Sequence, residues 1–379
     1  MKKYCIPQGM NSGKKTTVGI LFGGKSAEHE VSLQSAKNVY DAIDKNRFDP
    51  VLIGIDKTGK WRATGDSLSL LNTSDPRRIS LRQDGDEVAL IPESAGLLAE
   101  SPQSGMKKTG FGKLDVIFPI LHGPFGEDGT VQGLLKLANI PFVGSGVLGS
   151  AVGMDKDVMK RLSRDAGIPI GKYIAVRRHE AVPSFTETEA ALGIPVFIKP
   201  ANMGSSVGIN KAHNEAEYAA AIQEAFQYDA KIIIEEFIRG REIECAVLGN
   251  ETPKASIPGE VIPTHEFYSY DAKYLDENGA ALEIPAKLEA SAQKRVQELS
   301  VKVFQTLCCD GLARVDFFLR ENGEVIFNEI NTMPGFTKIS MYPKLWGACG
   351  IGYTDLISRL IDLAMEKHQK EQNIKIAYD

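Results

Sequence analysis

The chain has 379 residues, of which 43% are hydrophobic, and this length and composition predict two or three well-packed domains. Its formal net charge of -5 and its scattered lysines and arginines argue against nucleic acid as a partner. No apolar run is long enough for a signal peptide or a membrane span, so no membrane partner is expected, and five cysteines without paired spacing favour the reducing cytoplasm.

An α/β layer follows an N-terminal extension, residues 1–16. From Thr17 the pattern predicts a strand (VGILF), a glycine-rich turn and a helix from about Val31. Residues 19–26, GILFGGKS, formally match the Walker A pattern. We reject that match because Ile20 to Phe22 belong to the strand, which leaves few backbone N–H groups for a phosphate. No G-x-G-x-x-G fingerprint follows, so an NAD-dependent dehydrogenase loses its main support.

The same layer continues with a second strand, predicted at Val116–Leu121. This strand ends at His122 in a glycine-rich turn, HGPFGEDG, before a helix near Thr130 and a short strand at 141–143. The polar stretch 66–113 is predicted to hold short hairpins and loops. Ligands of such sheets gather at the carboxyl ends of the strands, which makes the turn at His122 a candidate site.

A second region from near Gly144 is predicted to be a small α+β lid. It contains a helix (MDKDVMKRLSRDAG) and strands at 173–176 and 196–199, followed by the loop MGSSVG at 203–208. Glycine lets the backbone approach a phosphate closely, and the two serine hydroxyls add donors. Lysines that lie beside strand ends, helix starts or loops could supply the positive charge that ATP needs: Lys156, Lys199 and Lys273.

The third region predicts strands at 232–237 and 243–248, a tyrosine-rich loop, a helix at 290–307 and a final hairpin, ARVDFFLRENGEVIFNEIN. In this hairpin Asn322-Gly323 lies between two strand-like runs. That dipeptide is the strongest short-range signal for a two-residue type I′ turn.

Counting across the turn places four polar side chains on one face of the hairpin. With the residues that flank the turn paired, Asp316 lies opposite Glu329 and Arg314 lies opposite Asn331. Opposed carboxylates are destabilising unless a cation lies between them, and three oxygen-bearing side chains suit Mg²⁺ with nucleotide phosphates. The alternative is an exposed hairpin whose Arg314 pairs with the acids. The other face carries an apolar set suited to a core: Val315, Phe317, Leu319, Ile326 and Ile330.

From about Thr17 to Leu363 the chain resembles the D-alanine–D-alanine ligase family of the ATP-grasp superfamily. The resemblance implies an ATP-grasp fold, α/β and α+β: a Rossmann-like N-terminal domain at 17–143, a central lid at 144–238 and a catalytic domain at 239–379 with a mobile loop at 265–285. The segments that carry it occur in the family's order: LFGGKSAEHEVSLQSA, LHGPFGEDGTVQG, MDKDVMK, FIKPANMGSSVG, IIIEEFIRGREIE, FYSYDAKYL, ARVDFF and NEINTMPGFTKISMYP.

The resemblance implies an ATP site between the second and third regions. Asp316, Glu329 and Asn331 would hold two Mg²⁺ ions, for which Mn²⁺ can substitute. The residues implied for the nucleotide are Lys156, Lys199, Lys273 and Ser206 at the phosphates, Glu236, Phe237 and Ile238 along the adenine, Glu242 at the ribose, and Glu235 without a more specific role.

It also implies two D-alanine sites. Glu28 would orient the amino group of the first D-alanine, with His122 nearby, and Ser205 and Tyr274 would form a hydrogen-bonded link with Glu28. Arg314 and the N–H of Gly335 would stabilise the oxyanion of the tetrahedral intermediate. Ser340 and Met341 would bind the carboxylate end of the second D-alanine.

Simpler interpretations exist for single residues. Glu28 could be a first-turn charge favoured by the helix dipole, His122 a satisfied strand-end histidine, and Tyr274 a surface aromatic.

The implied activity is ATP-dependent ligation of two D-alanines through D-alanyl phosphate, for peptidoglycan synthesis, by a cytoplasmic homodimer that acts on small molecules. A D-alanine–D-lactate ligase is the nearest alternative, but the AKY pattern that ends at Tyr274 argues against it. A non-catalytic, ATP-binding regulator is the alternative from another functional class. Such a sensor needs no residue to stabilise an oxyanion, so the presence of Arg314 argues against it.

Overall fold

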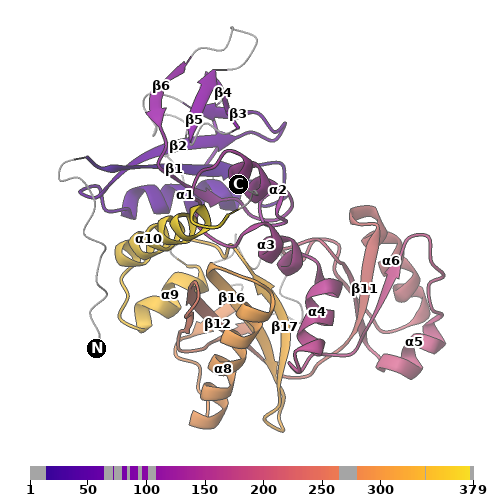
Figure 1. The fold of residues 1–379 in the computed structure, drawn as a ribbon. Helices are drawn as coiled ribbons and strands as arrows, with labels where there is room; N and C mark the ends of the chain where they lie inside the picture. The colour runs from indigo at the N-terminus through magenta and orange to yellow at the C-terminus, as the bar shows by residue number, and fades with distance from the viewer. Residues whose placement is uncertain are drawn as a thin grey trace.

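The structure is a computed structural model that describes residues 14–63, 71, 79–82, 86–92, 96–100, 108–263, 280–337 and 339–375. Its strands form three sheets, one after another along the chain (Figure 1). No helix among the described residues is long and apolar enough to span a membrane.

The first sheet has the strand order β6-β5-β4-β3-β2-β1-β7. Strand β1 lies next to the edge strand β7 and is parallel to both of its neighbours, β2 and β7. Ile20 and Phe22 of β1 point into one hydrophobic core and Leu21 into another, because helices or strands cover both faces. The elements are β1 (Thr16–Gly23), α1 (His29–Ala42), β2 (Phe48–Ile55), β3 (Trp61–Ala63), β4 (Asp86–Leu90), β5 (Leu97–Glu100), β6 (Lys108–Lys113), β7 (Val116–Ile120) and α2 (Thr130–Leu137).

The turn after β1 requires glycine. Gly23 has a φ of +91°, and a Cβ at this position would lie 2.2 Å from the carbonyl oxygen of Ile55. The turn leads directly into α1, whose first residue is His29, two residues before the predicted start at Val31. The strand that overlaps the Walker A match is therefore a buried strand, as the sequence indicated.

The second sheet is antiparallel, with the order β10-β9-β11-β8, and has a hydrophobic core of its own. The helix predicted at MDKDVMKRLSRDAG is divided from a preceding helix at Asp155, whose carboxylate accepts hydrogen bonds from the N–H groups of Asp157 and Val158, both at 3.1 Å. The elements are α3 (Val147–Met154), α4 (Lys156–Asp165), β8 (Tyr173–Arg177), α5 (Phe185–Leu192), β9 (Val196–Pro200), β10 (Asn210–Ala212), α6 (Glu215–Tyr228) and β11 (Lys231–Glu236).

The third sheet has the order β15-β14-β12-β16-β17, with β13 paired to β12. Helix α8 packs on one face, while α9 and α10 pack on the other and also reach the first sheet (Figure 1). The elements are β12 (Arg241–Gly249), β13 (Lys254–Ala255), β14 (Gly259–Pro263), β15 (Ala280–Glu283), α8 (Ala290–Thr306), β16 (Gly311–Leu319), β17 (Val325–Asn331), α9 (Met341–Ala348) and α10 (Tyr353–Gln372).

The turn of the β16–β17 hairpin differs from the prediction. Only Gly323 of the Asn322-Gly323 pair has a positive φ, +83°, whereas a type I′ turn needs one at both residues. The N–H of Arg320 donates to the carbonyl of Glu324 at 3.0 Å, so the loop has three residues instead of the predicted two. The strands therefore start one residue out of the predicted register, with Leu319 opposite Val325.

A β-bulge then restores the predicted pairs. Between the pairs Phe317–Phe327 and Asp316–Glu329 the register shifts by one, and Asn328 is the extra residue. Arg314 consequently lies opposite Asn331, as predicted. Near the turn the prediction for the core was wrong: Ile326 pairs with Phe318 on the other face, and Val325 and Phe327 join the core instead.

Candidate active site

A cavity of about 740 Å³ lies between the second and third sheets and reaches Glu28, the residue before helix α1 of the first. Most of the predicted site residues line it: Glu28, Lys156, Lys199, Ser205, Ser206, Glu235, Glu236, Phe237, Ile238, Glu242, Arg314, Asp316, Glu329, Asn331, Gly335, Ser340 and Met341. Two others, Lys273 and Tyr274, and most of the predicted loop 265–285 fall outside the described residues.

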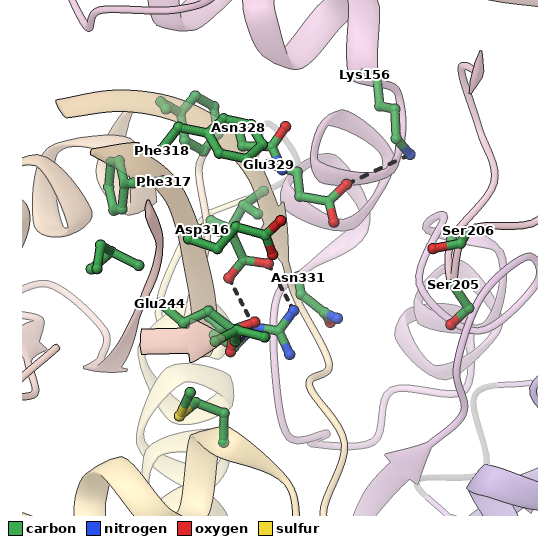
Figure 2. A pocket seen from close by; sticks show the side chains of 18 of the residues that line it. Lys156, Ser205, Ser206, Glu244, Asp316, Phe317, Phe318, Asn328, Glu329 and Asn331 are labelled. Carbon is green, nitrogen blue, oxygen red and sulfur yellow. Dashed lines mark hydrogen bonds and ion pairs between the residues drawn. The ribbon is translucent and has the colours of Figure 1, made fainter. Parts of the chain in front are cut away.

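The acidic wall of the cavity comes from the hairpin. Figure 2 shows Asp316, Glu329 and Asn331 projecting from β16 and β17 toward one side. Arg314 donates to both oxygens of Asp316, from Nε at 2.8 Å and from Nη2 at 2.7 Å. Its Nε also lies 3.1 Å from Oε2 of Glu244, a residue of β12 opposite Asp316. The guanidinium is thus fixed between two carboxylates at the floor of the cavity.

Glu244 was missed in the sequence. It alternates with Glu242 along β12, so the two side chains point to the same face, and both line the cavity. The two glutamates of the segment REIE (241–244) are two residues apart, and this spacing could have identified Glu244 as a site residue.

Lysines form the opposite wall. Lys199 Nζ lies 2.6 Å from one oxygen of Glu235, and Lys160 Nζ lies 2.6 Å from the other. Burial alone would raise the pKa of Glu235, but the two lysines lower it to about 2. Lys160 was also missed, although it follows Lys156 by four residues and must share its helix face.

Lys156 connects the two walls. Its Nζ donates to the carbonyl of Met203 at 2.6 Å and lies 3.9 Å from Oε2 of Glu329, the contact drawn across the cavity in Figure 2. Burial lowers the pKa of Lys156, and the charge of Glu329 opposes that shift. The lysine wall therefore presents positive charge to any anion that enters beside the hairpin.

The loop after β9 touches the first domain. Ser205 and Ser206 adopt left-handed backbone conformations, with φ of +52° and +63°. Ser205 Oγ donates a hydrogen bond to Oε1 of Glu28, the residue that precedes helix α1. The link between these two residues that the resemblance implied is thus present, and it joins elements 177 positions apart in the chain.

His122 is buried and lies behind the cavity wall. Its Nδ1 donates to the carbonyl of Met333 at 3.0 Å, and its Nε2 is 3.3 Å from Ser35 Oγ. Burial lowers the pKa of His122. Five residues on, Glu127 does line the cavity, and burial together with the charge of Glu28 raises the pKa of Glu127 to about 8. Glu127 belongs to the same HGPFGEDG motif but was not predicted as a site residue.

The end of β11 forms a narrow strip of the wall. Oε1 of Glu236 accepts from the N–H of Lys172 at 2.8 Å and from Nη2 of Arg320 at 3.3 Å. Phe237 beyond it is 42% exposed, and Lys211 Nζ stands 4.5 Å from its ring centroid. An exposed aromatic face beside backbone amides can receive a flat ring.

The N-terminus of α9 closes the far end of the cavity. Ser340 is the residue before this helix, and its Oγ accepts from the N–H of Thr337 at 3.1 Å. Gly335 lies so close that a Cβ there would be 2.9 Å from Ser340 Oγ. Helix N-termini favour negative charge, so this end suits a carboxylate.

The divalent-cation prediction fits the donor set. Among the described residues, no site is found that consists of three or more His, Cys, Asp or Glu side chains alone. The predicted set has two carboxylates and one amide, and hard cations accept such oxygens when phosphate oxygens complete the shell. Arg314 and Lys156 partly offset the charge of the opposed acids.

The chain was compared with known proteins. Residues 17–145 match the family described as D-ala D-ala ligase N-terminus, and residues 162–362 match D-ala D-ala ligase C-terminus. D-alanine--D-alanine ligase of Shouchella clausii is 57% identical over 364 residues, covering 95% of this chain and 98% of that protein. D-alanine--D-alanine ligase A of Escherichia coli K12 is 54% identical over 365 residues, covering 96% and 99%.

Solved structures agree. The D-alanine-D-alanine ligase from Coxiella burnetii has a TM-score of 0.83 and 36% identity, covering 95% of this chain and 97% of that one. The VanG D-Ala:D-Ser ligase from Enterococcus faecalis has a TM-score of 0.80 and 38% identity, covering 93% and 100%. The expected ATP-grasp fold is confirmed by these neighbours and by the three sheets. With both halves of the family matched and relatives above 50% identity along nearly the whole length, the chain belongs to the D-alanine–D-alanine ligase family.

Proposed function

We propose that the chain joins two D-alanine molecules to D-alanyl-D-alanine, with ATP as the energy source and D-alanyl phosphate as the intermediate. The dipeptide would serve as a peptidoglycan precursor. The observation that carries this proposal is the cavity of about 740 Å³ in which a lysine wall faces the Asp316–Glu329–Asn331 wall. Names of relatives at 54% and 57% identity support the same activity.

ATP would lie between the two walls. Its phosphates would contact Lys156, Lys199, Ser206 and Lys273. The adenine would lie along the strip from Glu236 to Ile238, and Glu242 would bind the ribose. Asp316, Glu329 and Asn331 would hold two Mg²⁺ ions, or Mn²⁺ in their place. When bound, these ions would neutralise charge on the phosphates during transfer.

The first D-alanine would bind beside helix α1. Glu28 would hold its amino group, with Ser205 and Tyr274 fixing Glu28 and with His122 supporting this end. The carboxylate must be activated, since a carboxylate is a poor electrophile, and phosphorylation at that oxygen produces the acyl phosphate.

The second D-alanine would bind at the N-terminus of α9. Ser340 and Met341 would hold its carboxylate end, and its amino group would attack the acyl phosphate. Negative charge then develops on the carbonyl oxygen, where Arg314 and the N–H of Gly335 would stabilise it before phosphate leaves. Closure of the loop 265–285 would exclude water, because water would hydrolyse the intermediate.

Three further features belong to the proposal. The domains are taken as 17–143, 144–238 and 239–379. The cytoplasm is the proposed location, supported by four free cysteines among the described residues. A homodimer is proposed, with an apolar patch on α2 and α3 as its contact: Leu134, Leu137, Val147 and Leu148, which are 36%, 66%, 40% and 61% exposed.

The test is a product assay with ATP and Mg²⁺. Incubation with D-alanine should give a dipeptide detected by mass together with one phosphate per dipeptide, and L-alanine should give neither. Because one neighbour is described as a D-Ala:D-Ser ligase, D-serine and D-lactate are offered in competition. We expect D-alanine to be preferred at neutral pH. Phosphate release without any dipeptide or ester would contradict the proposal.

A further inference from the structure

The turn after β7 holds the segment that follows β17 through both backbone polar groups of one residue, Met333. The N–H of Met333 donates to Glu127 Oε1 at 3.0 Å, and its carbonyl accepts from His122 Nδ1 at 3.0 Å. Both side chains come from the turn that follows β7. Asn331 lies two residues before Met333, and Gly335 lies two residues after it. The two hydrogen bonds at Met333 therefore restrict the positions of Asn331 and Gly335.

Glu127 has a further donor, the side chain of Asn331. The amide of Asn331 satisfies its surroundings in only one of its two orientations, assigned from its hydrogen-bond partners, with the nitrogen 2.9 Å from Glu127 Oε1 and 3.3 Å from the carbonyl of Met333. The amide oxygen is then turned away from Glu127. The other oxygen of Glu127 accepts from the N–H of Gly123 at 2.8 Å, which holds the carboxyl group in its own loop.

The orientation of this amide matters because only its oxygen can bind a hard cation; the NH₂ group is a donor. An amide without a fixed partner would present the wrong atom part of the time. Glu127 is suited to fix it, because both of its oxygens already accept backbone N–H groups from two separate segments. Its carboxyl group therefore cannot rotate without breaking one of those bonds.

We infer that Glu127 is a positioning residue of the divalent-cation site and that it directs the amide oxygen of Asn331 toward the cation. The inference rests on the proposed function, in which Asn331 is a metal ligand. Groups that orient metal ligands typically change metal affinity about 10- to 100-fold when removed. Glu127 acts through Asn331 and is not itself proposed as a ligand.

The experiment measures binding of Mn²⁺ in the presence of a non-hydrolysable ATP analogue, by electron paramagnetic resonance. Glu127→Met removes the acceptor but keeps the length of the side chain, and it should weaken Mn²⁺ binding about 10-fold. Glu127→Gln retains one oxygen for Met333 and Asn331 and should keep most of the affinity. Equal affinity in wild type and Glu127→Met would overturn the inference.

A second background separates positioning from general damage. A carboxylate offers an oxygen in either orientation, so in Asn331→Asp protein the change Glu127→Met should alter Mn²⁺ affinity by no more than about twofold. The same loss in both backgrounds would overturn the inference, because it would mean that Glu127 supports the loop and not the amide.

Gln132→Met serves as the matched control. Buried Gln132 donates to the carbonyl of Gly126 at 2.8 Å in the same loop, and we find no contact of this side chain with Asn331 among the described hydrogen bonds. It should lower the melting temperature and leave Mn²⁺ affinity unchanged. If wild type binds no Mn²⁺ with the nucleotide analogue, the proposed metal set fails as a whole. If wild type binds and only the Glu127 effect is missing, the inference alone fails.

Discussion

At the residue scale, Glu235 shows how strongly the site depends on charge balance. Its carboxylate is buried between Lys160 and Lys199, each 2.6 Å away. A buried ion pair is costly to break, since removing one partner leaves the other charge unpaired in a medium that solvates it poorly. Loss of Glu235 would thus leave two buried ammonium groups without this carboxylate partner.

The lowered pKa of Glu235 makes stability depend on pH. The ordinary value of 4.5 falls to about 2 in the folded protein, so the unfolded chain takes up this proton first as the solution is acidified. The ionised form therefore contributes roughly 3 kcal/mol above pH 4.5, and this contribution is lost between pH 4.5 and 2. Glu235→Gln should have a lower melting temperature than wild type at pH 7, and the difference should shrink toward pH 3. A difference that stays constant over this range would contradict the assignment.

Arg314 supplies a second prediction. Its planar guanidinium contacts both oxygens of Asp316 and also Glu244, an arrangement that the single ammonium of lysine cannot reproduce. Arg314→Lys should lower kcat by about 10²-fold or more while changing KM for ATP little, because the lost interaction forms mainly in the transition state. Steady-state kinetics with phosphate detection measure both constants. A loss confined to KM would place Arg314 in ground-state binding instead.

At the element scale, the hairpin separates what its sequence could predict from what it could not. The pairing of Asp316 with Glu329 was predicted from a two-residue turn, whereas the turn has three residues. A bulge at Asn328, which was not predicted, restores the predicted register at this pair. Alternation of polar and apolar residues cannot reveal such a bulge, because Phe327 and Ile326 are equally suited to a core. The two deviations cancel at the pairs Asp316–Glu329 and Arg314–Asn331 and remain visible in the three pairs between the bulge and the turn.

Other elements were predictable to different degrees for physical reasons. β1 was clear because Ile20, Leu21 and Phe22 are consecutive apolar residues that point into two cores. Lys160, Glu127 and Glu244 had local signals in the sequence, but each also contacts a residue from a distant strand or loop, and those contacts could not be predicted from spacing.

The three-residue turn gives a prediction of its own. Gly323 has a φ of +83°, and a Cβ added there would meet no atom within 4 Å beyond its chain neighbours, so a side chain at this position meets strain but no clash. Gly323→Ala should destabilise the protein by about 1 kcal/mol, whereas Gly323→Asn should cost less, because asparagine tolerates this conformation. Thermal melts of both variants test the difference. Equal melting temperatures for the two variants would argue against a strained left-handed position.

At the scale of the whole molecule, the hydrophobic cores divide the protein unequally. One core includes Val18 of β1, Leu312 of β16 and Leu360 of α10, so the first and third sheets share their interior. The second sheet has a separate core around Ile198 and Ile232. Motion that opens the cavity is therefore expected mainly between the second sheet and the rest, since that movement breaks no shared core.

The proposed dimer belongs to this scale. Leu137 and Leu148 are among the most exposed large apolar side chains of the described residues, at 66% and 61%. The double variant Leu137→Glu, Leu148→Glu should convert a dimer into a monomer that still folds, because neither side chain is in a core. Its melting temperature should fall only by what dimerisation contributes. Light scattering after gel filtration measures the mass. Val182→Glu, at a 37% exposed position between β8 and α5, is the control. A wild-type monomer, or a double variant that still dimerises, would contradict the proposed contact.

The shared core also bears on how the chain is synthesised. Leu356, Leu360 and Ala364 of α10 help to fill the interior that begins at Val18. A ribosome makes the first sheet and α1 early and α10 last, so the part of this core that α10 covers stays exposed until almost the entire polypeptide has emerged. A chain that terminates just before α10 would contain every residue that lines the cavity. It would nevertheless expose the apolar surface that α10 covers, and this surface could cause aggregation or bind chaperones.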